Sequence, residues 1–475
     1  MRKPGRAAIW VVIIVGGVLL ALLFSQFMGY RASLRTLPAG MTVAGLNVEG
    51  MTPDQALAAL ESAFAQPVQL SYRDQTVTLA VENVDFRFDA DGTRAAIEQA
   101  VVGRRSFDGF LAYLFRRRQT PIEIAPAATF SASRLDGFLA TVARQRDHPP
   151  QPPVALPEAL TFRAGIPGYA LDIEGSREPV RAALLSAANR QAELVVRESA
   201  PPPLEMAQLE DMLNGLLIPF NGIASIFVKD LRTGEELSIG PDIAFAGTSV
   251  LKIAVMTQVY RVLDEPPTVE QYDWLTDTMG SGSSNFKANL LLALVGGGDG
   301  FRGAEELTAA MGTLGLVNTF MITPYDEETL PYTVVTPANS RTDITTNPDP
   351  FMQTTAQDIG LLLEMIYQCS HGGGALLAAY PDDYTPEECQ QMLDIMSQNR
   401  IDSLIEAGLP PGTPLAHKHG WGPDTHANAG IVFSPQADFV LVVYLYNPVW
   451  LEWGVSNPLV NTIATATYNY FNPTP

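Results

Sequence analysis

The first pattern along the chain is an uncharged run from Ala7 to Tyr30, dominated by Ile, Val, Leu and Phe. As a helix, this run is long enough to cross about 30 Å of hydrocarbon. Cations within residues 1–6 favour a cytoplasmic N-terminus, so we expect a single-pass anchor in the cell membrane. A cleaved signal peptide is the alternative, although the run is longer than a usual signal-peptide core. In both cases everything after Tyr30 is extracytoplasmic.

Two similar segments follow the apolar run. The first predicts a helix from Thr52 to Ala65, with Thr52 as its N-cap, and an alternating strand from Val68 to Tyr72. The second segment follows a Pro-rich hinge at residues 148–153. It predicts the same order of loop, helix (180–188) and strand (193–196). Two such units suggest two related lobes in a smaller α+β domain.

The clearest domain boundary is Ala200-Pro-Pro-Pro203, because three prolines can join neither a helix nor a central strand. A different pattern begins after it. The expected elements are a helix over 205–217, a strand pair over 223–239, a mostly helical middle over 249–396, strands over 415–446 and a last helix from about 456 to 471. Strands at both ends of a helical middle predict one antiparallel sheet with helices on it, an α+β fold. We therefore expect three parts, 1–30, 31–203 and 204–475.

The composition narrows the class of protein. A chain of 475 residues with 47% hydrophobic residues supports two or three packed domains. The net charge is −21, which argues against a nucleic acid partner because such a partner requires a basic face.

A Ser-x-x-Lys run, Ser249 to Lys252, opens the helical middle. On a helix this spacing stacks the hydroxyl beside the amine, so a lysine with a lowered pKa could activate the serine. A single match of this kind occurs by chance about once or twice in a chain of this length. The match indicates catalysis only because two further elements accompany it. These are Ser283-Ser-Asn285 before an apolar helix and Lys418-His-Gly420 at the head of the β-rich tail.

In order and spacing, these three elements resemble those of the serine β-lactamase and penicillin-binding-protein superfamily. Lys287-Ala-Asn-Leu-Leu291 and Gly430-Ile-Val-Phe-Ser-Pro435 add a likeness to class A β-lactamases, over about residues 205–470. The resemblance implies a β-lactamase/transpeptidase-like fold and chemistry through an acyl-serine.

The resemblance also implies roles for the individual residues. Ser249 would be the nucleophile, Lys252 its base, Ser283 a proton relay and Asn285 a ligand of the Lys252 amine and the substrate amide. Lys418 would keep Lys252 neutral and attract a substrate carboxylate.

Three residues after Lys418 would meet the substrate: His419, Gly420 and Trp421. The backbone N–H groups of Ser249 and Trp421 would form the oxyanion hole. His419 departs from the Thr or Ser usual in the family, which puts substrate preference in doubt. A zinc site at His417, His419 and His426 is a weaker alternative, so we expect neither metal nor cofactor.

Class A β-lactamases clear the acyl-enzyme with a glutamate in an Arg-x-x-Glu-x-x-Leu-Asn loop. The corresponding stretch here, 318–331, lacks this pattern, and Glu327 and Glu328 are the nearest candidates for a deacylation base. Both are also well explained as solvated loop carboxylates. We therefore expect slow deacylation.

The region 38–200 resembles the peptidoglycan-binding domain that precedes VanW-like cell-wall proteins, through Val43-Ala-Gly-Leu-Asn-Val-Glu-Gly-Met-Thr52 and Pro167-Gly-Tyr-Ala-Leu-Asp172. A simple spacer is the alternative. The arginines at 104–105 and 116–118 could touch anionic polymer or lipid, or lie on a solvated face.

Cys369 and Cys389 are the only cysteines. In an exported domain such a pair is expected to form a structural disulfide.

The expected function is that of a membrane-anchored acyl-serine hydrolase that opens β-lactams through Ser249. The alternatives are a D-Ala-D-Ala peptidase-like peptidoglycan enzyme and a non-catalytic wall-binding protein. The expected partners are a β-lactam or D-Ala-D-Ala-type peptide, the membrane and, as a further candidate, peptidoglycan.

Overall fold

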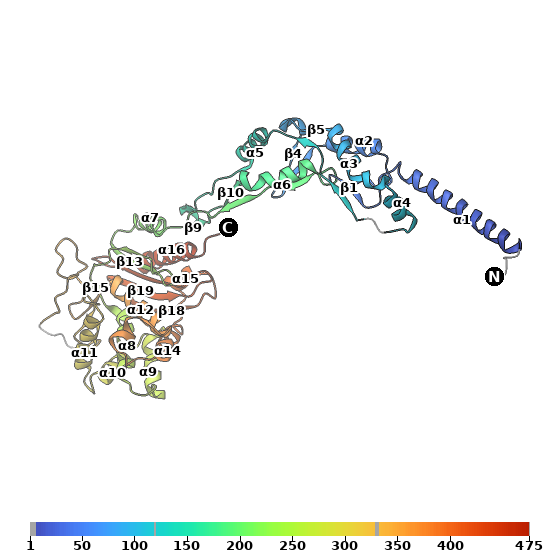
Figure 1. Cartoon of the computed structure of the whole chain (residues 1–475). Helices are drawn as coiled ribbons and strands as arrows, with labels where there is room; N and C mark the ends of the chain where they lie inside the picture. The colour runs from blue at the N-terminus through green and yellow to red at the C-terminus, as the bar shows by residue number, and fades with distance from the viewer. Residues whose placement is uncertain (1–5, 118–119, 328–331, 475) are drawn as a thin grey trace. The chain divides into compact units, whose positions relative to one another are not determined.

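The computed structural model describes residues 6–117, 120–327 and 332–474. The chain forms two compact units (Figure 1): an N-terminal unit, Met1–Gln151 with Ile166–Pro201, and a C-terminal unit, Pro152–Gly165 with Pro202–Pro475. A short hairpin from within the range 31–203 thus belongs to the C-terminal unit, so the chain passes between the units three times. The three expected parts stay a prediction.

The elements of the N-terminal unit are α1 (Arg6–Ser33), β1 (Met41–Val43), β2 (Leu46–Asn47), α2 (Pro53–Phe64), β3 (Val68–Tyr72), β4 (Gln75–Leu79), η1 (Val81–Val84), β5 (Arg87–Phe88), α3 (Ala90–Val101), η2 (Val102–Arg105), α4 (Phe107–Leu114), β6 (Ile122–Ile124), β7 (Ala128–Thr129), α5 (Ala132–Arg146), β10 (Gly168–Leu171), α6 (Ile173–Leu185), β11 (Gln191–Glu193) and β12 (Val196–Ser199).

Helix α1 carries the apolar run. Its segment Ile13–Ser33 spans 21 residues with a mean hydropathy of 2.0 and is long and apolar enough to cross a membrane. A signal sequence would pass the same test.

Helix α2 begins as its sequence indicates. The Thr52 side chain accepts a hydrogen bond from the Gln55 amide, and the Gln55 side chain accepts one from the Thr52 amide. Helix α6 begins at Ile173, seven residues before the expected start, because Asp172 caps it and Pro179 is tolerated inside it. Proline removes a single backbone hydrogen bond there, and the buried side chains of the helix hold it against its sheet.

The two similar segments of the N-terminal unit share one sheet. Strand β3 from the first pairs in parallel with β11 from the second, and β4 completes the order β11-β3-β4. One apolar cluster combines Val68 and Leu70 with Val180 and Leu184. The expected lobes therefore contribute to a common core.

The elements of the C-terminal unit are β8 (Val154–Leu156), η3 (Pro157–Ala159), β9 (Thr161–Arg163), α7 (Met206–Leu217), β13 (Ile223–Asp230), β14 (Glu236–Ile239), β15 (Phe245–Ala246), η4 (Thr248–Leu251), α8 (Lys252–Val262), α9 (Val269–Met279), α10 (Asn285–Val295), α11 (Gly300–Thr313), β16 (Phe320–Met321), β17 (Met352–Thr354), α12 (Ala356–Ser370), α13 (Gly374–Ala379), α14 (Pro386–Met396), α15 (Leu404–Gly408), β18 (Leu415–Trp421), β19 (Thr425–Val432), β20 (Phe439–Tyr446) and α16 (Trp453–Phe471).

An antiparallel five-stranded sheet organises this unit, in the order β14-β13-β20-β19-β18. It joins strands from both ends of the unit around the helical middle, which confirms the predicted α+β fold. Strand β18, which carries Lys418, is an edge strand of this sheet.

Both faces of the sheet are covered (Figure 1). Side chains alternate along a strand, so Val442 and Tyr444 of β20 pack with α8, α10 and α12, whereas Leu441 and Val443 pack with α7, α15 and α16. The strands of the tail are buried on both sides, and they position β18 rigidly against η4.

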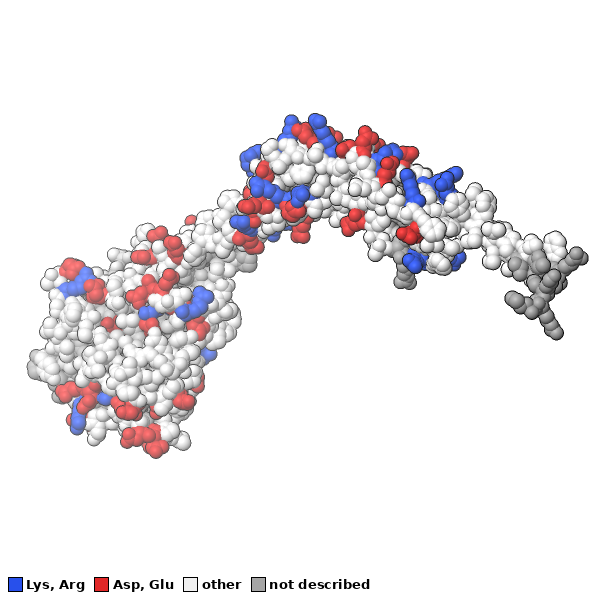
Figure 2. Space-filling model, in the orientation of Figure 1, with Lys and Arg blue, Asp and Glu red and all other residues white. Residues whose placement is uncertain are grey.

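Charge is distributed unequally between the units. The N-terminal unit holds 20 of the 30 Lys and Arg and 18 of the 51 Asp and Glu, a net charge of +2, whereas the C-terminal unit carries −23. In the view of Figure 2, basic side chains are correspondingly more frequent on the N-terminal unit.

Candidate active site

Ser249 and Lys252 lie three residues apart at the start of one helix. Ser249 sits in the 3-10 turn η4, and Lys252 is the first residue of α8. The expected helix thus begins as a 3-10 turn, in which side chains three residues apart eclipse each other. The Lys252 Nζ is accordingly 3.1 Å from the Ser249 Oγ.

The Ser283-Ser-Asn285 element surrounds the Lys252 amine from the other side. The Nζ lies 2.6 Å from the Ser283 carbonyl oxygen, 3.1 Å from the Ser283 Oγ and 2.8 Å from the Asn285 Oδ1. Ser284 caps α10 by accepting from the Lys287 amide, which fixes Asn285 as the first helical residue. These contacts bring four of the five predicted catalytic residues together.

The backbone is held in an uncommon conformation on both sides of this cluster. Thr248 and Ser283 have φ angles of 46° and 48°, in the left-handed region that residues with side chains rarely adopt. Such positions concentrate at functional sites, where the surrounding structure imposes them.

Strand β18 brings Lys418 and Gly420 to the same site. Residues 418 and 420 lie on the same face of β18 as Ala416, because side chains alternate along a strand. The Ala416 side chain packs with α8 and α12. A Cβ at Gly420 would lie 2.2 Å from the Thr248 Oγ1 and 2.8 Å from the Ser249 amide nitrogen, so only glycine permits this approach.

One amide at the edge of β18 is directed away from the sheet. The Gly422 amide donates to the Thr425 carbonyl across β19, 2.7 Å away. Because amides alternate in direction along an antiparallel strand, the Trp421 N–H is directed away from β19. Its direction fits the predicted second donor of an oxyanion hole.

Burial sets the electrostatics of the two lysines, whose side chains are both fully buried. Burial lowers the pKa of Lys252 to about 8, and the carboxylate of Asp326 opposes that shift. Burial, with a smaller contribution from the charge of Lys252, lowers the pKa of Lys418 well below its usual value. Lys418 Nζ donates to the His419 carbonyl, 3.0 Å away.

His419 follows Lys418 on β18. Its side chain projects from the face of β18 opposite to Lys418, where its ring is buried and stacks on Trp421 with a centroid distance of 4.7 Å. Its Nδ1 is 3.2 Å from the Asn399 Nδ2. The expected role of His419 in substrate binding stays a prediction.

The three histidines of the tail have protein partners. His417 Nε2 lies 3.1 Å from the Asn399 carbonyl, and His426 Nδ1 lies 2.6 Å from the Ser456 Oγ. Burial lowers the pKa of His417 to about 4 and that of His419 to about 3. Within the described ranges, no group of three His, Cys, Asp or Glu side chains is arranged to hold a metal ion.

The segment before residue 328 contributes two residues that the sequence did not single out. Asp326, with φ of 60°, accepts from the Asn285 Nδ2 at 2.8 Å. The buried Tyr325 ring lies 4.8 Å from the Lys252 Nζ, and its hydroxyl donates to the Thr248 carbonyl at 3.2 Å. Neither lies in a motif, and the sequence marked this segment only through the neighbouring Glu327 and Glu328.

Of the two candidate deacylation bases, Glu327 lies within the described residues. Glu327 is exposed and lines the cavity beside Asp326. Glu328 lies outside the described residues.

A cavity of about 620 Å³ opens over the cluster. Ser249, Asn285 and Trp421 line it, together with the segments 323–327 and 347–352. A volume of this size is typical of a small-molecule site.

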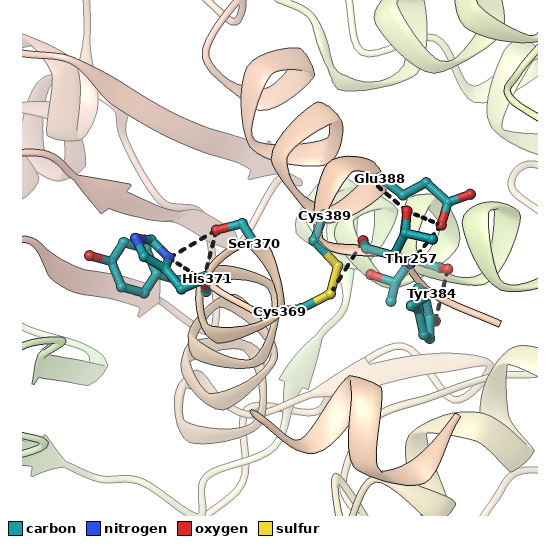
Figure 3. The surroundings of a disulfide bond; sticks show 9 residues. Thr257, Cys369, Ser370, His371, Tyr384, Glu388 and Cys389 are labelled. Carbon is teal, nitrogen blue, oxygen red and sulfur yellow. Dashed lines mark hydrogen bonds between the residues drawn. A yellow bond between two sulfur atoms is a disulfide. The ribbon is translucent and has the colours of Figure 1, made fainter. Parts of the chain in front are cut away.

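The predicted disulfide joins α12 and α14 (Figure 3). Cys369 of α12 and Cys389 of α14 form the expected bond, with Cα atoms 5.8 Å apart. Tyr384, in the loop between them, donates to the Thr257 carbonyl of α8 at 3.0 Å. The bond thus fixes the helices that pack beside α8.

One family model matches the C-terminal part of the chain. Residues 268–471 match the model of the beta-lactamase enzyme family. The match includes Ser283, Asn285 and Lys418 and begins after Lys252. No curated protein matches the chain.

Similar solved structures include PBP-A, 19% identical with a TM-score of 0.43, covering 57% of this chain and 98% of that one. A beta-lactamase from Xanthomonas campestris is 20% identical with a TM-score of 0.41, covering 55% and 98%. One from Sphaerobacter thermophilus is 16% identical with a TM-score of 0.42, covering 57% and 99%. On the family match, the C-terminal unit of this chain contains a beta-lactamase-like domain over residues 268–471.

Proposed function

We propose that the chain is a membrane-anchored, extracytoplasmic acyl-serine enzyme that opens β-lactams or D-Ala-D-Ala-type peptides. The observation that carries this proposal is the contact of 3.1 Å between the Ser249 Oγ and the buried Lys252 Nζ, at the floor of an open cavity. A lysine with a pKa of about 8 has a fraction of unprotonated amine near neutral pH, and that amine can accept a proton.

The reaction follows from these positions. Unprotonated Lys252 takes the proton of the Ser249 hydroxyl, and the Oγ forms a bond to the substrate carbonyl carbon. The Ser249 and Trp421 amides stabilise the negative charge on the carbonyl oxygen. The carbon–nitrogen bond then breaks, and the leaving nitrogen receives a proton from Lys252 through the Ser283 hydroxyl, which is 3.1 Å from the Nζ.

Two other residues bind the substrate in this proposal. The Asn285 side chain touches both Lys252 and Asp326, and a substrate amide would meet it at the cavity wall. Lys418 supplies positive charge for a substrate carboxylate, and that carboxylate would in turn favour the protonated form of Lys418.

Deacylation is the slower half of the cycle. No pattern positions Glu327 for the attacking water, and Asp326 is already hydrogen-bonded to Asn285. We expect a burst near one equivalent of opened β-lactam per enzyme, followed by slow turnover. Linear hydrolysis without a burst, abolished in Glu327→Gln, would contradict this expectation.

The N-terminal unit completes the proposal. Helix α1 serves as the membrane anchor, and the rest of the N-terminal unit, 34–151 with 166–201, serves as a peptidoglycan-binding module or spacer. Membrane fractionation of the chain tests the anchor, because a cleaved signal sequence would leave a soluble protein that begins after about Phe27.

A fluorescent penicillin tests the chemistry. The wild-type chain should become covalently labelled, Ser249→Ala should not, and Lys252→Ala should be labelled far more slowly. Thr257→Ala, behind the site on α8, is a matched control that should still be labelled. Absence of labelling in the wild type would favour a non-catalytic wall-binding protein, and labelling of Ser249→Ala would exclude Ser249 as the nucleophile.

A further inference from the structure

An exposed surface of mixed apolar and basic character lies on η2, on α4 and just after α4. We call it the interfacial surface, and it consists of Val102, Arg105, Phe107, Phe115, Arg116 and Arg117. Its large apolar side chains are 64% (Val102), 73% (Phe107) and 65% (Phe115) exposed. Apolar side chains with so much exposed area usually meet a partner surface.

Helix α4 is fixed to the end of α1. The Phe110 ring packs on Phe27 and Tyr30 with centroid distances of 5.6 and 5.2 Å, and Tyr113 packs on Tyr30 at 5.7 Å. These four rings form one aromatic cluster between the two helices.

Arg104 adds a polar link at the same level. Its guanidinium donates to the Ser33 and Thr36 carbonyls, at 3.1 and 3.0 Å, and so satisfies backbone groups at the C-terminal end of α1. The Tyr30 hydroxyl donates to the Ser106 carbonyl at 3.2 Å. These contacts therefore fix η2 and α4 at the height of the C-terminal end of α1 along the helix axis.

That level coincides with the end of the apolar run. The segment Ile13–Ser33 would be about 31 Å long as a helix, close to the thickness of the hydrocarbon core, and only 6% of its most apolar 18-residue window is buried by the protein. Phe27 and Tyr30 are then in the zone where membrane proteins concentrate aromatic residues. With α1 in a bilayer, Phe107 and Phe115 meet the boundary between headgroups and acyl chains.

We propose that the interfacial surface lies in the outer leaflet and binds anionic phospholipid. The inference rests on the proposed anchoring by α1. Phe107 and Phe115 bury their rings below the headgroups, while the arginines contact lipid phosphates. A hollow of about 590 Å³ between the end of α1 and α4, lined by Arg104, Arg116 and Arg117, has room for a headgroup.

Charge and polarity favour lipid over a wall polymer as the partner. Arg105, Arg116 and Arg117 outnumber the one exposed carboxylate of α4, Asp108, so the surface attracts anions. A hydrophilic polymer could satisfy the arginines, but it would leave Val102, Phe107 and Phe115 in water. A bilayer with anionic headgroups satisfies both sets of side chains.

Depth-dependent quenching in nanodiscs tests the inference with the full chain. Both natural cysteines are paired, so an added cysteine can carry an environment-sensitive fluorophore selectively. Phe107→Cys is the reporter, and Ile166→Cys, an exposed apolar position of the same unit, is the matched control. Discs of phosphatidylcholine contain either no or 30% phosphatidylglycerol, with quencher on the upper acyl chain.

We expect at least twofold quenching at position 107 and none at 166, with stronger quenching in anionic discs. Replacing Arg105, Arg116 and Arg117 by Gln should remove the dependence on anionic lipid, whereas Arg144→Gln with Arg146→Gln should not. Equal quenching at 107 and 166 in chains that co-purify with discs would overturn the inference. Chains that fail to enter discs would instead refute the anchor and the inference together.

A last experiment uses a soluble polyglycerol phosphate to distinguish a wall polymer from lipid as the partner. If the polymer shifts the emission at position 107 as strongly as anionic discs do, the surface binds wall polymer and the inference is wrong. If the polymer has no effect while anionic discs quench, lipid is the partner.

Discussion

The Lys252 amine determines how the proposed reaction depends on pH. Its pKa of about 8 is set by burial, and Asp326 prevents a larger fall. Because the unprotonated amine is the active base, acylation of Ser249 is slow where Lys252 is protonated. The pH profile of this one step therefore reports directly on the site.

We expect the rate of acylation by a chromogenic cephalosporin to rise about tenfold per pH unit below pH 8 and to level off above it. Stopped-flow measurement of the burst rate between pH 5.5 and 9.5 gives the profile. A rate that stays constant from pH 6 to 9 would rule out Lys252 as the base.

Asp326→Asn should move that profile toward acid. The asparagine can still accept the hydrogen bond from Asn285, but it lacks the charge that raises the pKa of Lys252. Acylation at pH 7 should then rise by roughly two- to threefold, with the inflection below pH 8. Glu327→Gln is the matched control, and we expect its inflection to stay in place. A shift toward alkaline pH in Asp326→Asn would contradict the assigned role of this carboxylate.

The sequence could identify residues whose spacing carries the chemistry. Ser249 and Lys252 sit three residues apart in one turn, so their contact is a local property of the helix start. Asp326 reaches the site from a loop 41 residues beyond Asn285, and no local spacing encodes that approach. The face of β18 that His419 occupies depends on which side of the sheet α8 covers, and this is set by the tertiary fold.

At the scale of elements, the contact of β18 with η4 brings the two halves of the site together. Gly420 is the point of closest approach, because a Cβ there would meet the Thr248 side chain and the Ser249 amide. An added methyl group would push the strand edge away and with it the Trp421 amide.

We therefore expect Gly420→Ala to lower the acylation rate at least about tenfold while the fold is retained, since an oxyanion donor would be displaced. Gly215→Ala on α7, where a Cβ would meet open space, should leave the rate unchanged. Circular dichroism and burst kinetics on both variants test this. Wild-type kinetics in Gly420→Ala would show that the approach is not needed for catalysis.

The disulfide has an expected effect on stability alone. It closes a loop with a sequence separation of 20 residues, so replacing both cysteines by serine should lower the free energy of unfolding by about 2–4 kcal/mol. Urea unfolding measures this loss. Labelling of Ser249 by fluorescent penicillin should be unaffected in the folded variant, and a specific loss of labelling would indicate a catalytic role for the α12–α14 loop.

Periodicity predicted the long elements and the antiparallel sheet because apolar alternation over 223–239 and 415–446 has no other stable arrangement than a buried sheet. It placed the start of α6 wrongly because Pro179 normally marks a helix start. It could not predict the pairing of β3 with β11, which joins residues more than 120 positions apart.

At the scale of the whole molecule, the two units differ strongly in net charge. The C-terminal unit carries −23, whereas the N-terminal unit is nearly balanced. An anionic surface would repel the first and tolerate the second. This difference in charge favours the proposed position of the N-terminal unit beside anionic lipid.

The hairpin β8–β9 makes the chain interleaved, because a piece of the C-terminal unit is made before the N-terminal unit is complete. Phe162 of β9 is fully buried against the Tyr470 ring of α16, and the Thr474 amide donates to its carbonyl. A protein trimmed to begin at residue 204 would therefore lack a core side chain of its own, a loss on the scale of about 3–5 kcal/mol.

Such a trimmed protein should unfold at a lower temperature and regain stability when a separate peptide spanning 152–165 is added. By the same logic, a single protease cut between Pro201 and Glu205 should leave two pieces that still migrate together in size-exclusion chromatography. The hairpin would then act as a noncovalent tether that keeps the catalytic unit on its anchor after the main-chain link is lost.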